Sequence, residues 1–172
     1  MEGYIRQARF SDMEKIVEIF ESGRQFLKEQ GLPQWQDGEG PNRALAERDI
    51  ENGHGYVLVF QGQVAGYASL VPSPDGSPPL TEGEWQPGHD RHVVIHRVAL
   101  DGTLRGRGLS QQFLRDIVIA AGLLGYQDVR IDTHPGNMIM RKITEKTGFL
   151  YKGLMHLPIA NGERLAYQIV FD

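Results

Sequence analysis

The turn LRGRGLS at residues 104–110 contains the residue types that bind phosphate groups. An apolar, alternating run precedes this turn, and an amphipathic helical pattern follows it. The first N–H groups of a helix lack intrahelical acceptors, and the helix dipole adds about half a positive charge at that end. Gly106 and Gly108 let the backbone approach a ligand with no Cβ in the way. With the charges of Arg105 and Arg107, the turn predicts a site for a phosphate-bearing ligand.

Two other phosphate-binding loops do not fit this turn. The loop of nucleotide hydrolases needs a glycine followed by lysine and then serine or threonine, and the turn contains no such sequence. The dinucleotide-binding loop G-x-G-x-x-G needs a third glycine where this chain has Gln111. Two interpretations stay open: a pyrophosphate site made by a strand, a turn and a helix N-terminus, or a plain helix N-terminus with solvated arginines.

Three histidines, His89, His92 and His96, suggest a metal site, but their spacing is unfavourable. His92 and His96 share one face of a predicted strand and lie about 13 Å apart at ~3.3 Å per residue. Zn–N bonds of about 2.0 Å do not bridge that distance. The chain contains no cysteine, which excludes thiolate ligands, disulfides and a thiolate nucleophile. We therefore expect no metal.

Hydrophobic periodicity predicts the elements that position these residues. Strand patterns cover residues 4–10, 55–60, 63–71, 92–100, 128–133, 149–156 and 164–171. Helical patterns cover residues 13–31, 42–51, 109–124 and 138–147. The order βααβββαβαββ predicts one α/β domain over residues 1–172, with a mixed sheet and helices packed on it. The stretch 72–90 has too many prolines for a strand ladder and is predicted to be a long loop.

The composition is that of an ordinary globular domain. The 172 residues carry a net charge of −4, with 40% hydrophobic and 23% charged residues, which suits a single core. The negative net charge argues against nucleic-acid binding by bulk electrostatics. No apolar run approaches the ~20 residues that span a bilayer, and the N-terminal sequence lacks the layout of a signal peptide. These features predict a cytoplasmic protein that binds neither nucleic acid nor membrane.

The turn and the segments after it resemble the GCN5-related N-acetyltransferase (GNAT) family. The acetyl-CoA pyrophosphate loop of that family reads [R/Q]-x-x-G-x-[G/A], with Arg105 and Gly108 at the first and middle positions and Ser110 as a departure at the last. Residues 130–153 resemble the following strand, helix and "GF" strand, with Asn137 at the helix-opening asparagine. The resemblance covers nearly the whole chain and implies a GNAT-like, mixed and mostly antiparallel sheet.

This resemblance implies an enzyme that transfers an acetyl group directly from the thioester of acetyl-CoA to a primary amine of a small molecule or peptide. In that fold the strand before the loop splays from its neighbour, so that its backbone groups bind the pantetheine arm. A backbone N–H near Leu100 would polarise the thioester carbonyl. The expected cofactor-binding residues are Val98, Ala99, Leu100, Arg105, Gly106, Arg107, Gly108, Leu109, Ser110 and Asn137.

Three residues are candidates for proton transfer. His96 lies on the strand that would carry the thioester, and an imidazole with an ordinary pKa near ~6.5 suits a general base; the alternative is a packed histidine without a chemical role. Glu84 is the rival base, or else a solvated loop carboxylate. Where many relatives have a tyrosine that protonates the leaving thiolate, this chain has Thr144. Either water or Tyr151 would then supply that proton.

Two tryptophans are candidates for the site that binds the amine acceptor. Trp35 and Trp85 lie in predicted loops, where they either line an amine pocket by cation–π contact or anchor their loops. A homodimer is compatible with the sequence. The alternative to an enzyme is a non-catalytic acyl-CoA-binding or regulatory module with the same fold, because no base is unambiguous and the usual tyrosine is missing.

Overall fold

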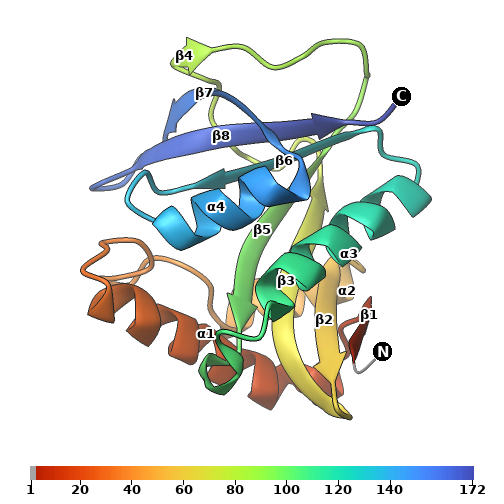
Figure 1. Cartoon of the computed structure of the whole chain (residues 1–172), viewed down its shortest axis with the longest axis vertical. Coiled ribbons are helices and arrows are strands. Elements are labelled where there is room, and N and C mark those ends of the chain that lie inside the picture. Colours follow the sequence, from red (N-terminus) through yellow and green to blue (C-terminus); the bar gives the residue numbers. More distant parts are fainter. Residues whose placement is uncertain (1–2) are drawn as a thin grey trace.

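The computed structural model describes residues 3–172 and consists of one eight-stranded sheet with helices on both faces (Figure 1). The strands are β1 (Gly3–Gln7), β2 (Gly55–Phe60), β3 (Gln63–Pro72), β4 (Glu82–Gly83), β5 (Val93–Leu100), β6 (Asp128–Thr133), β7 (Leu150–His156) and β8 (Glu163–Val170). The helices are α1 (Met13–Glu29), α2 (Arg43–Glu51), α3 (Leu109–Leu123) and α4 (Met138–Thr147), with 3₁₀ turns at Phe10–Asp12 and Gly102–Leu104.

The strands follow the spatial order β1-β2-β3-β5-β6-β8-β7-β4. Every pair of neighbours is antiparallel except β5 and β6, which are parallel. The predicted mixed, mostly antiparallel sheet is therefore confirmed. The described residues contain no helix long and apolar enough to cross a membrane.

Alternating side chains of the sheet build an apolar layer on each face. In β2, Leu58 faces the layer that contains Phe113 of α3, whereas Val57 faces the layer that contains Ile16 and Phe20 of α1. All five side chains are buried, and each such burial contributes about 1.5–3 kcal/mol relative to exposure. The two layers fix α1 on one face of the sheet and α3 on the other.

The sheet opens between β5 and β6. Only Val93, Val94 and Ile95 of β5 pair with β6, over residues 129–131. Beyond this point β5 continues beside β3 as far as Leu100, whereas β6 continues beside β8. Figure 1 shows the two strands diverging from their short contact. Past Ile95, one edge of β5 therefore has no strand partner in the part of the chain that the structure describes, and its backbone N–H and C=O groups face a gap.

A bulge at Arg97 marks the point of divergence. Arg97 has φ +59°, and the pairing of β3 with β5 shifts between Tyr67 and Ser69. A non-glycine residue in this conformation costs about 1–3 kcal/mol and persists only where its surroundings hold it. Here the Arg97 guanidinium donates two hydrogen bonds to Asp49 of α2, at 2.9 and 2.7 Å, and Tyr67 donates a third at 2.6 Å. The buried Asp49 carboxylate thus ties α2 to the bulge.

We expect Asp49→Ala to lower the free energy of unfolding by about 3–5 kcal/mol, because it leaves the largely buried Arg97 charge unpaired. The matched control is Glu14→Ala, which removes the solvent-exposed ion pair with Arg43 and should cost at most about 1 kcal/mol. Urea denaturation measures both. Equal losses in the two variants would show that the buried pair does not hold the bulge.

The long segment between β3 and β5 differs from its prediction as a loop without a ladder. Its two-residue strand β4 pairs with Gly153 and Leu154 of β7. Gly83 and Gly153 make this possible, because a Cβ on either glycine would collide with the backbone of the other strand. The Gln168 side chain also bonds the backbone N–H and C=O of Gln86, at 2.8 and 3.2 Å. The segment is therefore fastened across the sheet.

Candidate active site

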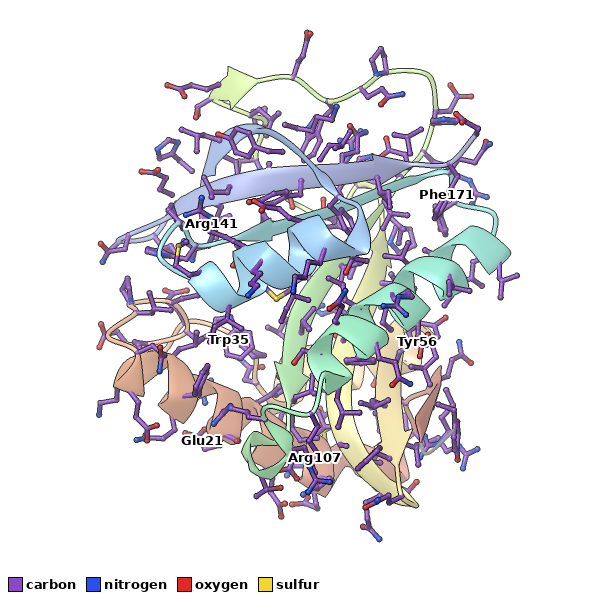
Figure 2. The ribbon with its side chains drawn as sticks, in the orientation of Figure 1. Glu21, Trp35, Tyr56, Arg107, Arg141 and Phe171 are labelled. Atoms are coloured by element: carbon purple, nitrogen blue, oxygen red, sulfur yellow. The ribbon has the colours of Figure 1, made fainter. Side chains whose placement is uncertain are left out.

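A cleft of about 990 Å³ fills the opening between β5 and β6. Its walls come from α1 and the loop after it, from β5 and the turn before α3, from α4, and from β6 and the loop between β7 and β8. Trp35 lies in the loop after α1, on the side that faces the start of α4 (Figure 2). Trp35 and the unpaired edge of β5 thus line the same cavity.

The glycine turn opens this cleft with free backbone donors. Gly106 and Gly108 have φ of +83° and +72°, which glycine adopts without strain. A Cβ at either position would meet no atom within 4 Å. The first intrahelical hydrogen bond of α3 runs from Gln112 to the Gly108 carbonyl. Within residues 3–172 no group accepts from the N–H groups of residues 106–111. This row of donors at the positive end of α3 suits an anion.

The side chains of the two arginines in the turn lie at the margin of the cleft or outside its wall. The Arg105 guanidinium stacks 3.7 Å from the ring centroid of Phe26 and donates to the Ser22 carbonyl at 3.3 Å. Its charge therefore lies against α1 at the margin of the cleft. The Arg107 side chain is exposed at the start of α3 (Figure 2) and is not part of the cleft wall. The backbone donors, more than the arginine side chains, define this site.

The other expected cofactor residues border the same cavity. Val98, Ala99 and Leu100 line it from the unpaired edge of β5, and Ser110 lines it from the first turn of α3. Asn137 caps α4: its side-chain Oδ1 accepts from the Met140 N–H at 3.1 Å, and its Nδ2 donates to Oε1 of Gln34 at 3.2 Å. The asparagine therefore joins α4 to the loop after α1 across the cleft.

His96 forms a pair that the sequence did not suggest. Its Nε2 lies 2.7 Å from Oδ2 of Asp75, whose side chain is 5% exposed. Burial alone would raise the pKa of Asp75, but hydrogen bonds from His96 and Ser77 hold that pKa well below its usual range. Because the ionised carboxylate only accepts hydrogen bonds, we assign a proton to Nε2 of His96. This contact leaves Nδ1 as the ring nitrogen that a base role would use, and His96 lines the cleft.

The remaining proton-transfer candidates lie away from the cleft. Glu84 is exposed beside β4, and its N–H donates to Lys152 of β7. Tyr151 is 53% exposed on β7 and stacks edge-on against Tyr167 at 5.8 Å. Thr144 is fully buried in α4, and its hydroxyl has no partner among the described residues. Glu84, Tyr151 and Thr144 do not line the cleft, and the catalytic roles of Glu84 and Tyr151 stay predictions.

Two charged residues that line the cleft were not predicted from the sequence to be site residues. Asp132 and Arg164 lie on neighbouring strands β6 and β8, and both line the cavity that contains His96. Trp85, in contrast, carries the Arg130 guanidinium 4.2 Å above its ring, which favours its role as a loop anchor. The structure, over residues 3–172, holds no group of three or more side chains suited to a metal ion.

Comparisons with known proteins agree with this geometry. A model described as the acetyltransferase (GNAT) family matches residues 16–149. YesJ of Bacillus subtilis, described as an uncharacterized N-acetyltransferase, is 22% identical over 151 residues, which make up 87% of this chain and 83% of that protein.

Solved structures are similar over nearly the full length. A GNAT-family acetyltransferase from Streptococcus agalactiae is 32% identical, with a TM-score of 0.86 and coverage of 99% of this chain and 96% of that chain. The yncA protein of Salmonella typhimurium, solved with its cofactor acetyl-CoA, is 19% identical, with a TM-score of 0.69 and coverage of 100% and 95%. At 19% identity, the similarity to yncA shows a shared fold alone.

Proposed function

The chain belongs to the GNAT acetyltransferase family, and we propose that it transfers an acetyl group from acetyl-CoA directly to a primary amine of a small molecule or peptide. The observation that carries this proposal is the row of unpaired N–H groups at residues 106–111, next to the unpaired edge of β5 in one cleft. A long ligand with a pyrophosphate at one point and an amide-bearing arm further along fits this combination.

The residues present suit acetyl-CoA. The N–H groups of the turn would bind the pyrophosphate, where the open space above Gly106 and Gly108 admits it. The edge of β5 at residues 98–100 would pair with the amides of the arm, and the N–H near Leu100 would donate to the thioester oxygen. Bound acetyl-CoA supplies an acyl group activated as a thioester.

His96, assisted by Asp75, would act as the general base that deprotonates the acceptor amine. Nδ1 of His96 takes a proton from the ammonium group, and the Asp75 carboxylate on Nε2 stabilises the imidazolium. The amine nitrogen then forms the new C–N bond as the C–S bond breaks. Of the two protons that the ammonium loses, one passes through His96 to solvent and the other reaches the sulfur. With Thr144 buried, water is the donor that we propose for the sulfur.

Release of free thiol tests this function. Acetyl-CoA is incubated with the protein and with separate amino acids, polyamines, aminoglycosides and peptides, and the thiol is followed with a chromogenic reagent. We expect release that requires both the protein and one class of amine. Binding of acetyl-CoA by calorimetry without thiol release from any amine would favour the non-catalytic module instead. The expected cytoplasmic location and homodimer stay predictions, which cell fractionation and size-exclusion chromatography check.

A further inference from the structure

Asp132 and Arg164 present opposite charges on one face of the sheet. Asp132 lies opposite Ala166 in the antiparallel pair of β6 and β8, and Arg164 is two residues from Ala166. Side chains at such diagonal positions share a face, with their Cβ atoms about 7–8 Å apart. Both residues line the cleft. The separation leaves room for one small molecule to touch both charges.

The Arg164 side chain is buried without a counter-ion. The residue is 6% exposed, and its Nη1 donates to the carbonyls of Asn161 and Glu163, at 2.9 and 2.8 Å. Its Nε and Nη2 make no hydrogen bond to any residue in 3–172, and no carboxylate in that range forms an ion pair with it. A buried charge of this kind is costly unless it is paired. An anionic group entering the cleft would supply the missing partner.

Asp132 and His96 complete the surroundings of this space. Ile95 pairs with Ile131 in the parallel contact of β5 and β6, so His96 and Asp132 are the next residues on the two strands. Burial raises the pKa of Asp132, and the charges of His96 and Arg164 oppose that rise. A cation in the cleft would favour the ionised carboxylate further. The site therefore offers a cation, an anion and a base together.

We infer that the acceptor is a free amino acid or a closely related small amine that carries a carboxylate. Arg164 binds the carboxylate, Asp132 binds the ammonium group, and His96 takes the proton. Trp35, Leu157 and Ile159 line the same cleft and would contact the substrate side chain. This inference rests on the acetyltransferase function proposed above and names its substrate class.

The same charges disfavour the other amine classes. A polyamine or an aminoglycoside would bring further positive charges toward Arg164, without an anion to pair with it. A peptide N-terminus has an uncharged amide where the free amino acid has its carboxylate, so Arg164 would stay without a counter-ion. A buried cation left unpaired in the complex weakens binding.

The test compares acids with their amides. Each of the twenty L-amino acids, the corresponding carboxamides, spermidine and kanamycin are assayed for thiol release with saturating acetyl-CoA. At least one amino acid should exceed its own carboxamide in kcat/KM by about 10²-fold. Faster acetylation of spermidine, kanamycin or the carboxamides overturns the inference and leaves the proposed function intact. No thiol release from any of these amines overturns the inference, and it counts against the proposed function as well if the peptides of the earlier assay also give no release.

Variants of two arginines separate binding from folding. Arg164→Gln should abolish most of the preference for acid over amide, by raising KM for the amino acid about 10²-fold while KM for acetyl-CoA stays within about twofold. The control is Arg130→Gln on β6, whose guanidinium is already paired with Asp128 at 2.8 Å and which should keep the preference. Thermal unfolding follows the stability of both, and Arg164→Lys, which retains the charge, should keep part of the preference. An unchanged ratio in a folded Arg164→Gln would overturn the assignment.

Discussion

His96→Gln and His96→Ala should each lower kcat/KM for the acceptor about 10²-fold or more, with little change in KM for acetyl-CoA. The loss reflects the missing base, since neither side chain takes a proton near neutral pH. The two variants differ in stability. The glutamine amide can still donate to Asp75, whereas alanine leaves that buried carboxylate with Ser77 as its only side-chain donor among residues 3–172 and should cost about 1–3 kcal/mol. Steady-state kinetics and urea denaturation separate the two effects.

The pH profile gives an independent check on this base. Imidazole must be neutral to accept a proton, so wild-type kcat/KM should rise with pH and then level off, and this rise should vanish in His96→Gln. The pKa of Asp75 is held well below its usual range, so this carboxylate stays ionised throughout and is not the source of the rise. Asp75→Asn removes an anion that stabilises the imidazolium, and the rise should therefore move to lower pH. A rise that persists in His96→Gln would assign it to the amine itself.

The elements could be predicted because their signals are local. The β-branched and aromatic residues at 55–60 and the 3.6-residue spacing in residues 109–123 are each features of a single segment, and the structure has β2 and α3 at these places. The bulge at Arg97 has no such signal, because it depends on an ion pair with Asp49, 48 residues away. Strand β4 escaped prediction for a similar reason: it forms only where Gly83 meets Gly153 of another strand.

The residues of the candidate site likewise fall into those with a local sequence signal and those that depend on distant contacts. The turn with Gly106 and Gly108 could be found from the sequence, since a glycine-rich turn before a helix carries its own conformational signal. Asp75 could not be found, because it reaches His96 through a long loop whose path depends on distant contacts. Arg164 lies in an ordinary strand pattern, and its unpaired state becomes visible only once β6 and β8 are in register. Long-range pairing, rather than residue type, decides these roles.

Gly108→Val should raise KM for acetyl-CoA tenfold or more. At this position a branched side chain would occupy the open space in front of the unpaired N–H groups of α3, where we place the pyrophosphate. Backbone strain contributes as well, because φ at Gly108 is +72° and a β-branched residue there costs about 1–3 kcal/mol. The measurement must therefore separate a blocked site from a strained turn.

Gly62→Val provides that separation. Gly62 has φ +77° in the turn between β2 and β3, and a Cβ there also meets no atom within 4 Å. The two variants thus introduce the same side chain at nearly the same φ, Gly108 inside the cleft and Gly62 outside it. Both should lose a similar free energy of unfolding, but only Gly108→Val should weaken acetyl-CoA binding, as measured by KM and by calorimetry. Unchanged affinity in Gly108→Val would remove the turn from the cofactor site, because the added side chain would then lie in space that acetyl-CoA does not use.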